Sequence, residues 1–328
     1  MSALLINSDA LSIPLASRSV QCVVTSPPYW ALRDYGVSGQ IGLEAEPDEY
    51  VTRIVTVFRE VWRVLRDDGT CWINLGDTYS QDTKWGGRSG DKNYTSSAGG
   101  YQTARNMRTR TGLAPKSLVG IPWRVALALQ CDGWCLRSDI IWHKPNPMPE
   151  SVKDRPTRAH EYLFLFSKSS HYYYDARAIA EPVSGNAHSR GNGVNAKTQR
   201  YPAGWAAGPG NHDVRLHNQT RLHRSRQNES YSARVTELVT TRNRRTVWTI
   251  PTFGYPKAHF ATFPPALVEP CVLAGSRAGD VVLDPFCGSG TTGAVAVAHG
   301  RSFVGLELKR EYIELARERL DESRGDQR

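Results

Sequence analysis

Residues 281–308 read VVLDPFCGSGTTGAVAVAHGRSFVGLEL, a pattern of strand, glycine-rich turn, helix and strand. The β-branched run before the turn predicts a buried strand, and Gly288 and Gly290 let the backbone turn tightly and approach a ligand. Glu307 ends the second strand, where a carboxylate can accept both hydroxyls of a ribose. The string is neither GxGxxG nor GxxxxGK[ST], so it favours neither a nicotinamide dinucleotide site nor a nucleotide triphosphatase. Taken alone, it also fits a tight turn of any α/β protein.

The alternation of strand and helix continues along most of the chain. Short apolar, β-branched runs predict strands, and apolar residues at steps of three and four predict amphipathic helices. Strands are expected at 2–6, 19–25, 70–76, 134–144, 161–169, 280–286 and 302–308. Helices are expected at 47–66 (ended by Asp67-Asp68-Gly69), 117–130, 263–276, 291–300 and 310–320, with a short helix between the first two strands. This order predicts an α/β fold with a doubly wound, mostly parallel sheet covered on both faces.

The positive charge of the chain is concentrated in two segments that interrupt this alternation. The chain carries 41 basic and 32 acidic residues. Residues 79–116 contain seven basic and two acidic residues, and residues 171–245 contain twelve and five. Such polar segments are usually solvated loops, but beside nucleic-acid chemistry they predict flexible basic contacts to a polyanion.

Several classes of protein are disfavoured by composition. No run of 18 apolar residues occurs, so we expect no membrane span, and the first fifteen residues do not resemble a secretory signal. Six cysteines in 328 residues do not form a disulfide scaffold, so we expect free thiols in a reducing cytosol. Cys131 and Cys135 have no matching second pair, so we expect no bound metal.

A second motif, Ser26-Pro27-Pro28-Tyr29 (the SPPY motif), follows the predicted strand at 19–25. Two consecutive prolines fix φ and remove two backbone donors, which leaves a turn rich in acceptors. The Ser26 side chain and the Pro27 carbonyl could each accept one hydrogen of an exocyclic amino group. Tyr29 could stack on a base that has left the duplex. Taken alone, the motif fits an ordinary turn equally well.

Together the two motifs resemble those of the amino-group DNA methyltransferases. DPFCGSGTT at 284–292 resembles their S-adenosylmethionine loop, and the SPPY motif resembles their catalytic motif. Because the catalytic motif comes first, the order resembles the beta group, in which the two halves are circularly permuted. The resemblance covers about two-thirds of the chain. It implies a class I, Rossmann-like methyltransferase core, with a catalytic half at 1–170 (including the basic loop 79–116), a cofactor half at 246–328, and an inserted target-recognition region at 171–245.

The resemblance also implies the roles of individual residues. The catalytic residues would be Ser26, Pro27, Pro28 and Tyr29. The cofactor S-adenosyl-L-methionine would be bound by Asp9 at its adenine, by Glu307 at its ribose, and by Asp284, Pro285, Phe286, Cys287, Gly288, Ser289, Gly290, Thr291 and Thr292 at its methionine part, with His259 to Phe263 lining that end. The DNA would be contacted by Lys144, Arg155, Arg158, Arg242, Arg244 and Arg245.

Other polar residues near the motifs are expected to have supporting roles. We expect Asn74 and Asp77 to support the SPPY motif without a catalytic role, and His160 and Glu161 to anchor the strand that they begin. Cys271 follows a proline, as a carbon-5 cytosine methyltransferase would require, but it lies in a predicted helix and is expected in the core. Cys287 is expected to be a small filler.

The expected function is therefore site-specific methylation of an exocyclic amino group in double-stranded DNA. N4 of cytosine and N6 of adenine have nearly even odds, with a slight lean to cytosine on the motif. An RNA or protein methyltransferase and a catalytically decayed DNA-binding relative are the alternatives. A homodimer would suit a palindromic site. We expect a bacterial or phage-encoded protein of the cytoplasm, associated with the nucleoid. The chain has no nuclease motif, so a restriction partner, an orphan regulator and phage self-protection all fit.

Overall fold

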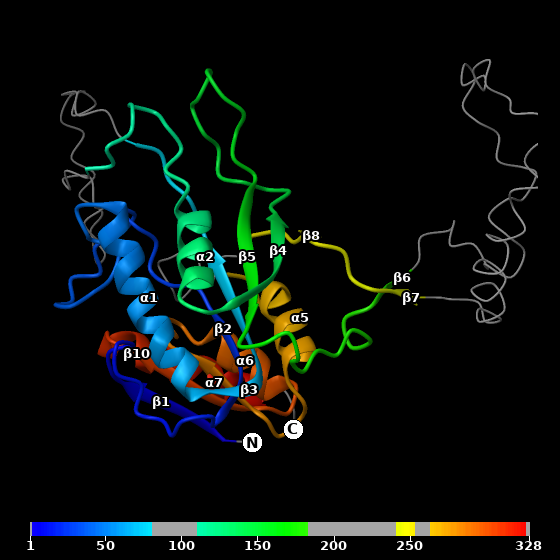
Figure 1. The fold of residues 1–328 in the computed structure, drawn as a ribbon. Coiled ribbons are helices and arrows are strands. Elements are labelled where there is room, and N and C mark those ends of the chain that lie inside the picture. The colour runs from blue at the N-terminus through cyan, green and yellow to red at the C-terminus, as the bar shows by residue number, and fades with distance from the viewer. Residues whose placement is uncertain (1, 81–109, 183–240, 253–262, 326–328) are drawn as a thin grey trace, which may run out of the picture. The chain divides into compact units, whose positions relative to one another are not determined.

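The computed structural model describes residues 2–80, 110–182, 241–252 and 263–325, and Figure 1 shows their fold. The chain divides into two compact units, Met1–Ile179 with Arg245–Arg328, and Ala180–Arg244. In the described part of the second unit, β6 (Glu181–Pro182) pairs with β7 (Thr241–Arg242) in antiparallel register. The functional residues discussed below belong mainly to the first unit.

An eight-stranded sheet forms the centre of the first unit, in the order β1-β10-β9-β2-β3-β5-β4-β8. The strands are β1 (Ala3–Asn7), β2 (Val20–Thr25), β3 (Leu65–Leu75), β4 (Cys135–His143), β5 (His160–Ser167), β8 (Val247–Thr249), β9 (Val281–Asp284) and β10 (Ser302–Glu307). All neighbouring strands are parallel except at β5, which runs antiparallel to both β3 and β4. The predicted mostly parallel, doubly wound sheet is confirmed.

Helices cover both faces of this sheet (Figure 1). On one face lie α1 (Pro47–Val64) and α2 (Ile121–Cys131), and on the other lie α5 (Pro265–Gly275), α6 (Thr291–Ala298) and α7 (Arg310–Gly325). Neighbouring strand residues alternate between the two cores, as Val23 and Val24 of β2 show. Both faces are therefore buried, which explains why the strands read as continuous apolar runs.

Two local expectations about the first hundred residues are wrong. The first long helix ends at Val64, and Asp67-Asp68-Gly69 lie inside β3, because Leu65 already pairs with Val20 of β2. Residues 8–18 form turns instead of a short helix. In this segment the Asp9 carboxylate accepts a hydrogen bond from the Leu11 N–H, a local bond that competes with helix formation.

The expected insertion at 171–245 overlaps both compact units. Residues 171–179 belong to the first unit, where the Tyr173 N–H donates to the Asp68 carbonyl and the Asp175 N–H donates to the Ala274 carbonyl. The side chains of Tyr172 and Tyr174 pack against the core on the face of the sheet covered by α5, α6 and α7. Residues 183–240 and 81–109 lie outside the described residues, so target recognition by these two basic segments stays a prediction.

The strand order brings the two sequence motifs together. The SPPY motif follows β2 and the glycine-rich loop follows β9, and these strands are parallel neighbours with Val23 opposite Leu283. The order of strands reverses at this point of the sheet, and ligands of doubly wound folds bind where it does. None of the helices among the described residues is long and apolar enough to cross a membrane.

Candidate active site

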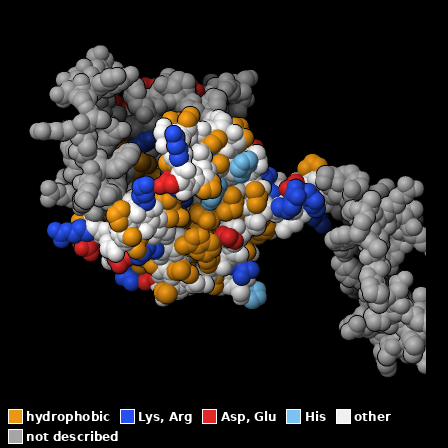
Figure 2. All heavy atoms as spheres, turned by 90° about the horizontal axis from the view of Figure 1, so that it is seen from above, with side chains coloured by type: hydrophobic (Ala, Val, Ile, Leu, Met, Phe, Trp, Pro, Cys, Tyr) orange, Lys and Arg blue, Asp and Glu red, His pale blue; other side chains and the backbone are white. Residues whose placement is uncertain are grey.

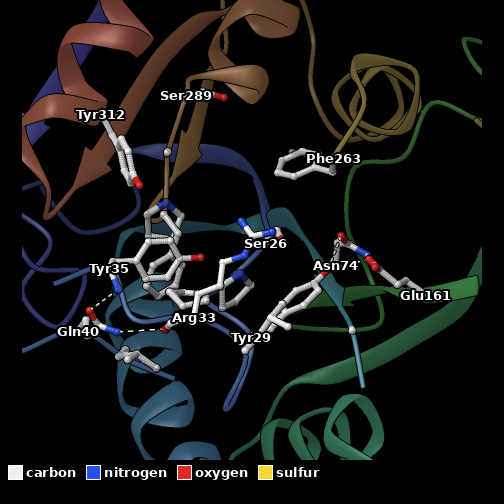
Figure 3. A pocket seen from close by; sticks show the side chains of 18 of the residues that line it. Ser26, Tyr29, Arg33, Tyr35, Gln40, Asn74, Glu161, Phe263, Ser289 and Tyr312 are labelled. Atoms are coloured by element: carbon white, nitrogen blue, oxygen red, sulfur yellow. Dashed lines mark hydrogen bonds between the residues drawn. The ribbon is translucent and has the colours of Figure 1, made fainter. Parts of the chain in front are cut away.

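A cavity of about 720 Å³ lies at the carboxyl ends of these central strands (Figure 3). Its size suits a small-molecule site. Residues from both motifs line it, together with other residues that the sequence predicts: Asp9, Ser26, Pro27, Pro28, Tyr29, Lys144, Arg158, Phe263, Pro285, Phe286, Gly288, Ser289 and Glu307. Of the segment expected to begin at His259, residues 259–262 lie outside the described residues. Both halves of the chain therefore share one cavity, as the two motifs predict.

Asp284 lies behind the wall of the cavity instead of facing it. Its Oδ1 accepts hydrogen bonds from the Thr25 hydroxyl at 2.7 Å and the Phe286 N–H at 3.0 Å. Its Oδ2 accepts one from the Thr292 hydroxyl at 2.8 Å. Burial raises the pKa of Asp284 to about 6. Asp284 therefore joins the end of β2 to the loop after β9, and its predicted role in holding the cofactor stays a prediction.

The remaining loop residues outside the cavity lining also support its shape. They are Cys287, Gly290, Thr291 and Thr292. Gly290 has a φ of +78°, and an added Cβ would lie 3.0 Å from the Ala316 Cβ, so only glycine permits this approach of α7. Cys287 is buried, and burial raises the pKa of its thiol well above the usual value, so the thiol is not poised as a nucleophile. Cys271 is fully buried in the core, as expected.

Glu307 presents a partly satisfied carboxylate to the cavity. The Gly288 N–H donates to its Oε2 at 2.9 Å, and the Lys309 N–H donates to its Oε1 at 2.8 Å. A carboxylate has about four acceptor positions, so Glu307 can accept a further hydrogen bond. Burial raises the pKa of Glu307, so hydroxyl donors from a ligand would stabilise its charged form. The other predicted cofactor acid, Asp9, also lines the cavity, with Oδ1 bound by the Leu11 N–H.

A loop at residues 33–40 forms a wall that sequence reasoning missed. The Gln40 side chain accepts from the Tyr35 N–H at 2.9 Å and donates to the Arg33 carbonyl at 3.3 Å, which fixes the loop (Figure 3). Tyr35 packs edge-on against Tyr312 of α7, with ring centroids 6.4 Å apart. Both rings line the cavity. No motif marks these residues, and the turn residues in the loop are the only sequence signal.

The hydroxyl of Tyr29 belongs to a hydrogen-bond network at the other side of the cavity (Figure 3). It donates to Glu161 Oε2 at 2.6 Å and lies 3.0 Å from Asn74 Oδ1. Lys144 forms an ion pair with the other oxygen of Glu161. Burial, reinforced by the Glu161 charge, raises the pKa of Tyr29 well above its usual value, so the phenol stays neutral. The ring is thereby held in one orientation.

Two neighbours fix the backbone and ring of the SPPY motif. The Tyr50 hydroxyl donates to the Pro28 carbonyl at 2.9 Å. Gly76 follows β3 directly, and an added Cβ there would lie 2.4 Å from Tyr29 Cε2. The ring of Tyr29 therefore occupies space that any side chain at position 76 would need.

The supporting residues differ in part from expectation. Asn74 supports the SPPY motif, as expected, through Tyr29. Asp77 instead accepts hydrogen bonds from the Gly120 and Ile121 N–H groups and caps the start of α2. Glu161 does begin β5 with His160, but its side chain also reaches the cavity and holds Tyr29.

The six residues predicted to contact DNA lie in different parts of the structure. Lys144 lines the cavity, where its Nζ lies 4.2 Å from the centroid of the Trp142 ring and pairs with Glu161, and its contact with DNA stays a prediction. Arg155 pairs with Glu150 at 2.7 Å, whereas Arg158 lines the cavity. Within the described residues, Nη1 of Arg158 is buried without a hydrogen-bond partner, which leaves a donor for a ligand.

The remaining three arginines flank the boundary between the two units. Arg242 pairs with Glu181 at 2.6 Å across the β6–β7 ladder. Arg244 ends the second unit and Arg245 begins the returning segment of the first. Their contact with DNA stays a prediction.

Comparison with protein families gives a match over residues 20–318 to a family described as DNA methylase, covering N6 and N4 amino-methyltransferases. Among curated proteins, the chain is 45% identical over 320 residues to the type II methyltransferase M.Cfr9I of Citrobacter freundii, covering 97% of this chain and 87% of that protein. It is also 45% identical over 306 residues to the type II methyltransferase M.SmaI of Serratia marcescens, covering 93% and 86%.

Solved structures share the fold at lower sequence identity. The PvuII DNA methyltransferase, described as cytosine-N4-specific, aligns with a TM-score of 0.60 at 18% identity, covering 97% of this chain and 86% of that one. A putative DNA modification methylase of Thermus thermophilus, solved in complex with S-adenosyl-L-methionine, aligns with a TM-score of 0.54 at 24% identity, covering 98% and 96%. The Rossmann-like α/β architecture is thus shared with both.

Proposed function

Because the chain belongs to the DNA methylase family of N6 and N4 amino-methyltransferases, we propose that it methylates an exocyclic amino group of a base in duplex DNA at a specific sequence. The methyl donor is S-adenosyl-L-methionine. The observation that supports this function is the meeting of the SPPY motif and Glu307 in the lining of one cavity.

The residues at one side of the cavity fit the cofactor. The Glu307 carboxylate suits the ribose hydroxyls, and Asp9 offers a second carboxylate. Tyr35, Phe286 and Tyr312 provide apolar walls for the adenosine. When bound, S-adenosyl-L-methionine supplies a methyl group on a positively charged sulfur, which is already a strong electrophile. The protein has to position the acceptor and exclude water.

The other side of the cavity positions the target base. The Ser26 side chain and the Pro27 carbonyl accept the two hydrogens of the amino group and direct its lone pair toward the methyl donor. Tyr29 stacks on the extruded base, with its ring fixed by Glu161 and Asn74. Asp284 acts behind the wall by holding Thr25, which directly precedes Ser26. The proton of the methylated amino group leaves to solvent.

The same acceptors serve N4 of cytosine and N6 of adenine, so the proposal covers both. The names of the type II relatives support a role in restriction-modification, in which this chain protects its host DNA in the cytoplasm from an endonuclease of the same specificity. A twofold dimer associated with the nucleoid would match a palindromic site. Sedimentation of the full chain with and without DNA tests the dimer.

A labelled-methyl assay tests the function. The full chain is incubated with S-adenosyl-L-methionine labelled in its methyl group and with duplex DNA, RNA or polypeptide in parallel. We expect label in DNA alone, on N4-methylcytosine or N6-methyladenine after digestion to nucleosides, and none with a Ser26→Ala, Tyr29→Ala double variant. Label in RNA or polypeptide alone would show a different methyltransferase. Binding of the cofactor without methyl transfer to any substrate would show that the chain is a catalytically decayed, DNA-binding relative.

A further inference from the structure

Met148 is a large apolar residue held in solvent at the wall of the catalytic cavity. Its exposed fraction is 84%, the highest among the large exposed hydrophobic residues described in the structure, and it is also one of the cavity-lining residues. It lies in the loop between β4 and β5, flanked by Pro147 and Pro149. Figure 1 shows this green loop rising from the carboxyl end of β4, and Figure 2 shows hydrophobic side chains gathered at the centre of that face.

The loop is anchored on both sides of Met148. Before it, the Asn146 side chain accepts from the Thr252 N–H at 2.9 Å and donates to the Thr252 carbonyl at 3.3 Å. After it, Glu150 pairs with Arg155 and accepts from the Arg158 N–H at 3.2 Å. The two flanking prolines restrict the backbone further. The loop therefore presents Met148 outward from a backbone that is fixed on both sides.

The duplex must meet the protein at the mouth of this cavity. A base can reach the SPPY motif only by leaving the stack, and its departure leaves a gap between its two former neighbours. Proteins that kink DNA insert apolar side chains between base steps, and methionine is among those used. Methionine is unbranched and flexible, so it can slide between bases and adapt to the space.

We infer that Met148 enters the base stack of the duplex and fills the space left by the extruded base. The ligand of this residue is thus the pair of base faces flanking the target, and the role is to stabilise the extruded state. This inference rests on the proposed function, since it requires a base to leave the duplex. Met148 would thus bind the substrate DNA, in a role separate from that of the groups that contact the amino nitrogen.

Single-turnover methylation by the full chain tests this role. The recognition site is first identified by sequencing the DNA of a host that expresses the chain. The substrates are two synthetic duplexes that carry this site, one fully paired and one with an abasic residue opposite the target base. In the second duplex the target has no pairing partner, so extrusion needs less assistance. For Met148→Ala we expect about a tenfold slower rate than wild type on the paired duplex, and a rate within about twofold on the abasic one. Because Met148 is exposed, its truncation leaves the core intact.

Two control variants separate stacking from other effects. Met148→Leu keeps an apolar side chain and should keep most of the wild-type rate. Leu127→Ala truncates a residue of α2 with an exposed fraction of 51% outside the cavity lining, and should leave both rates unchanged. A wild-type rate for Met148→Ala on the paired duplex, or an equal loss on both duplexes, overturns the inference while the function stands. A wild-type chain that methylates neither duplex overturns the function itself, and the inference with it.

Discussion

The hydroxyl of Tyr29 lies 2.6 Å from Oε2 of Glu161, a residue 132 positions further along the chain. This hydrogen bond connects the turn after β2 to the start of β5, and the Lys144 ammonium holds the other oxygen of the same carboxylate. A ring fixed in this way loses little conformational entropy when a base stacks on it. The contact explains how a flexible tyrosine can act as a rigid platform.

Substitutions at Tyr29 and Glu161 should lower turnover without affecting cofactor binding. For Tyr29→Ala we expect kcat to fall about 10- to 100-fold, since stacking on an aromatic ring contributes about 1–3 kcal/mol per base. Glu161→Gln keeps an acceptor for the Tyr29 hydroxyl and should lose less than Glu161→Ala. Steady-state kinetics with calorimetric titration of S-adenosyl-L-methionine separate the two effects. Wild-type turnover by Tyr29→Ala would refute the assignment of this site.

Gly76→Ala should displace the Tyr29 ring, because the new Cβ would lie 2.4 Å from Tyr29 Cε2. We expect kcat to fall by about 10- to 100-fold, as misplacement of a positioning group by about 1 Å can do. The control is the double variant with Tyr29→Ala, in which nothing remains to collide. If the ring carries the effect, the double variant is no slower than Tyr29→Ala alone. Additive losses would show that Gly76 acts in another way.

Asp284 should make the stability of the fold depend on pH. Burial raises its pKa from the ordinary 3.8 to about 6, so the folded chain binds this proton more tightly than the unfolded chain does. Its contribution to stability is therefore full below about pH 3.8 and is lost as the pH rises through about 6.

The isosteric variant Asp284→Asn isolates this contribution, because it cannot ionise. Between about pH 5 and pH 8 we expect the stability of the wild type to fall relative to that of Asp284→Asn by about 1.4 kcal/mol. Urea unfolding of both proteins at the two pH values measures the difference. An unchanged difference would mean that the Asp284 carboxylate stays charged throughout this range.

Substituting Arg242, Arg244 and Arg245 together with alanine should weaken DNA binding and flatten its dependence on salt. Each lost phosphate contact lowers the slope of log K against log salt by about 0.9, so the largest expected change is about 2.7. The pairing of Arg242 with Glu181 reduces its share. Binding titrations at several salt concentrations give the slope.

The matched control removes the same charge from another part of the fold. Arg18, Arg59 and Arg66 are exposed, and Arg18 and Arg66 lie near the amino ends of β2 and β3, opposite the cavity. Their replacement by alanine should change the slope far less. If the salt slope changes equally in the two triple variants, only the net charge of the protein matters. That result would refute the assignment of Arg242, Arg244 and Arg245 as DNA contacts.

The fold could be predicted largely from the sequence because buried parallel strands and amphipathic helices have distinct periodicities. Where local and tertiary signals conflict, the prediction failed: Leu65 fits a helical pattern but pairs as a strand with Val20. The two motifs were visible because each combines rare residue types over a short span. Their meeting then follows from the parallel pairing of β2 and β9.

The rest of the site depends on topology that no local pattern shows. Glu161 reaches Tyr29 only because β5 is inserted antiparallel beside β3, which periodicity does not reveal. Tyr35 and Tyr312 come from opposite ends of the sequence and meet through the packing of a loop on α7, where the Lys309 ammonium also donates to the Tyr35 carbonyl. The three hydrogen bonds by which Asp284 joins β2 to the loop after β9 also depend on the pairing of distant strands.

Methylation of an amino group of DNA in this cavity can be measured directly in living cells. The full chain and its Tyr29→Ala variant are expressed in a bacterial host free of DNA methylation, and the host DNA is sequenced by single-molecule kinetics. We expect N4-methylcytosine or N6-methyladenine at one short motif with the wild type, and a strong reduction with the variant. Unmodified DNA from a wild-type protein that is folded and binds S-adenosyl-L-methionine would contradict it.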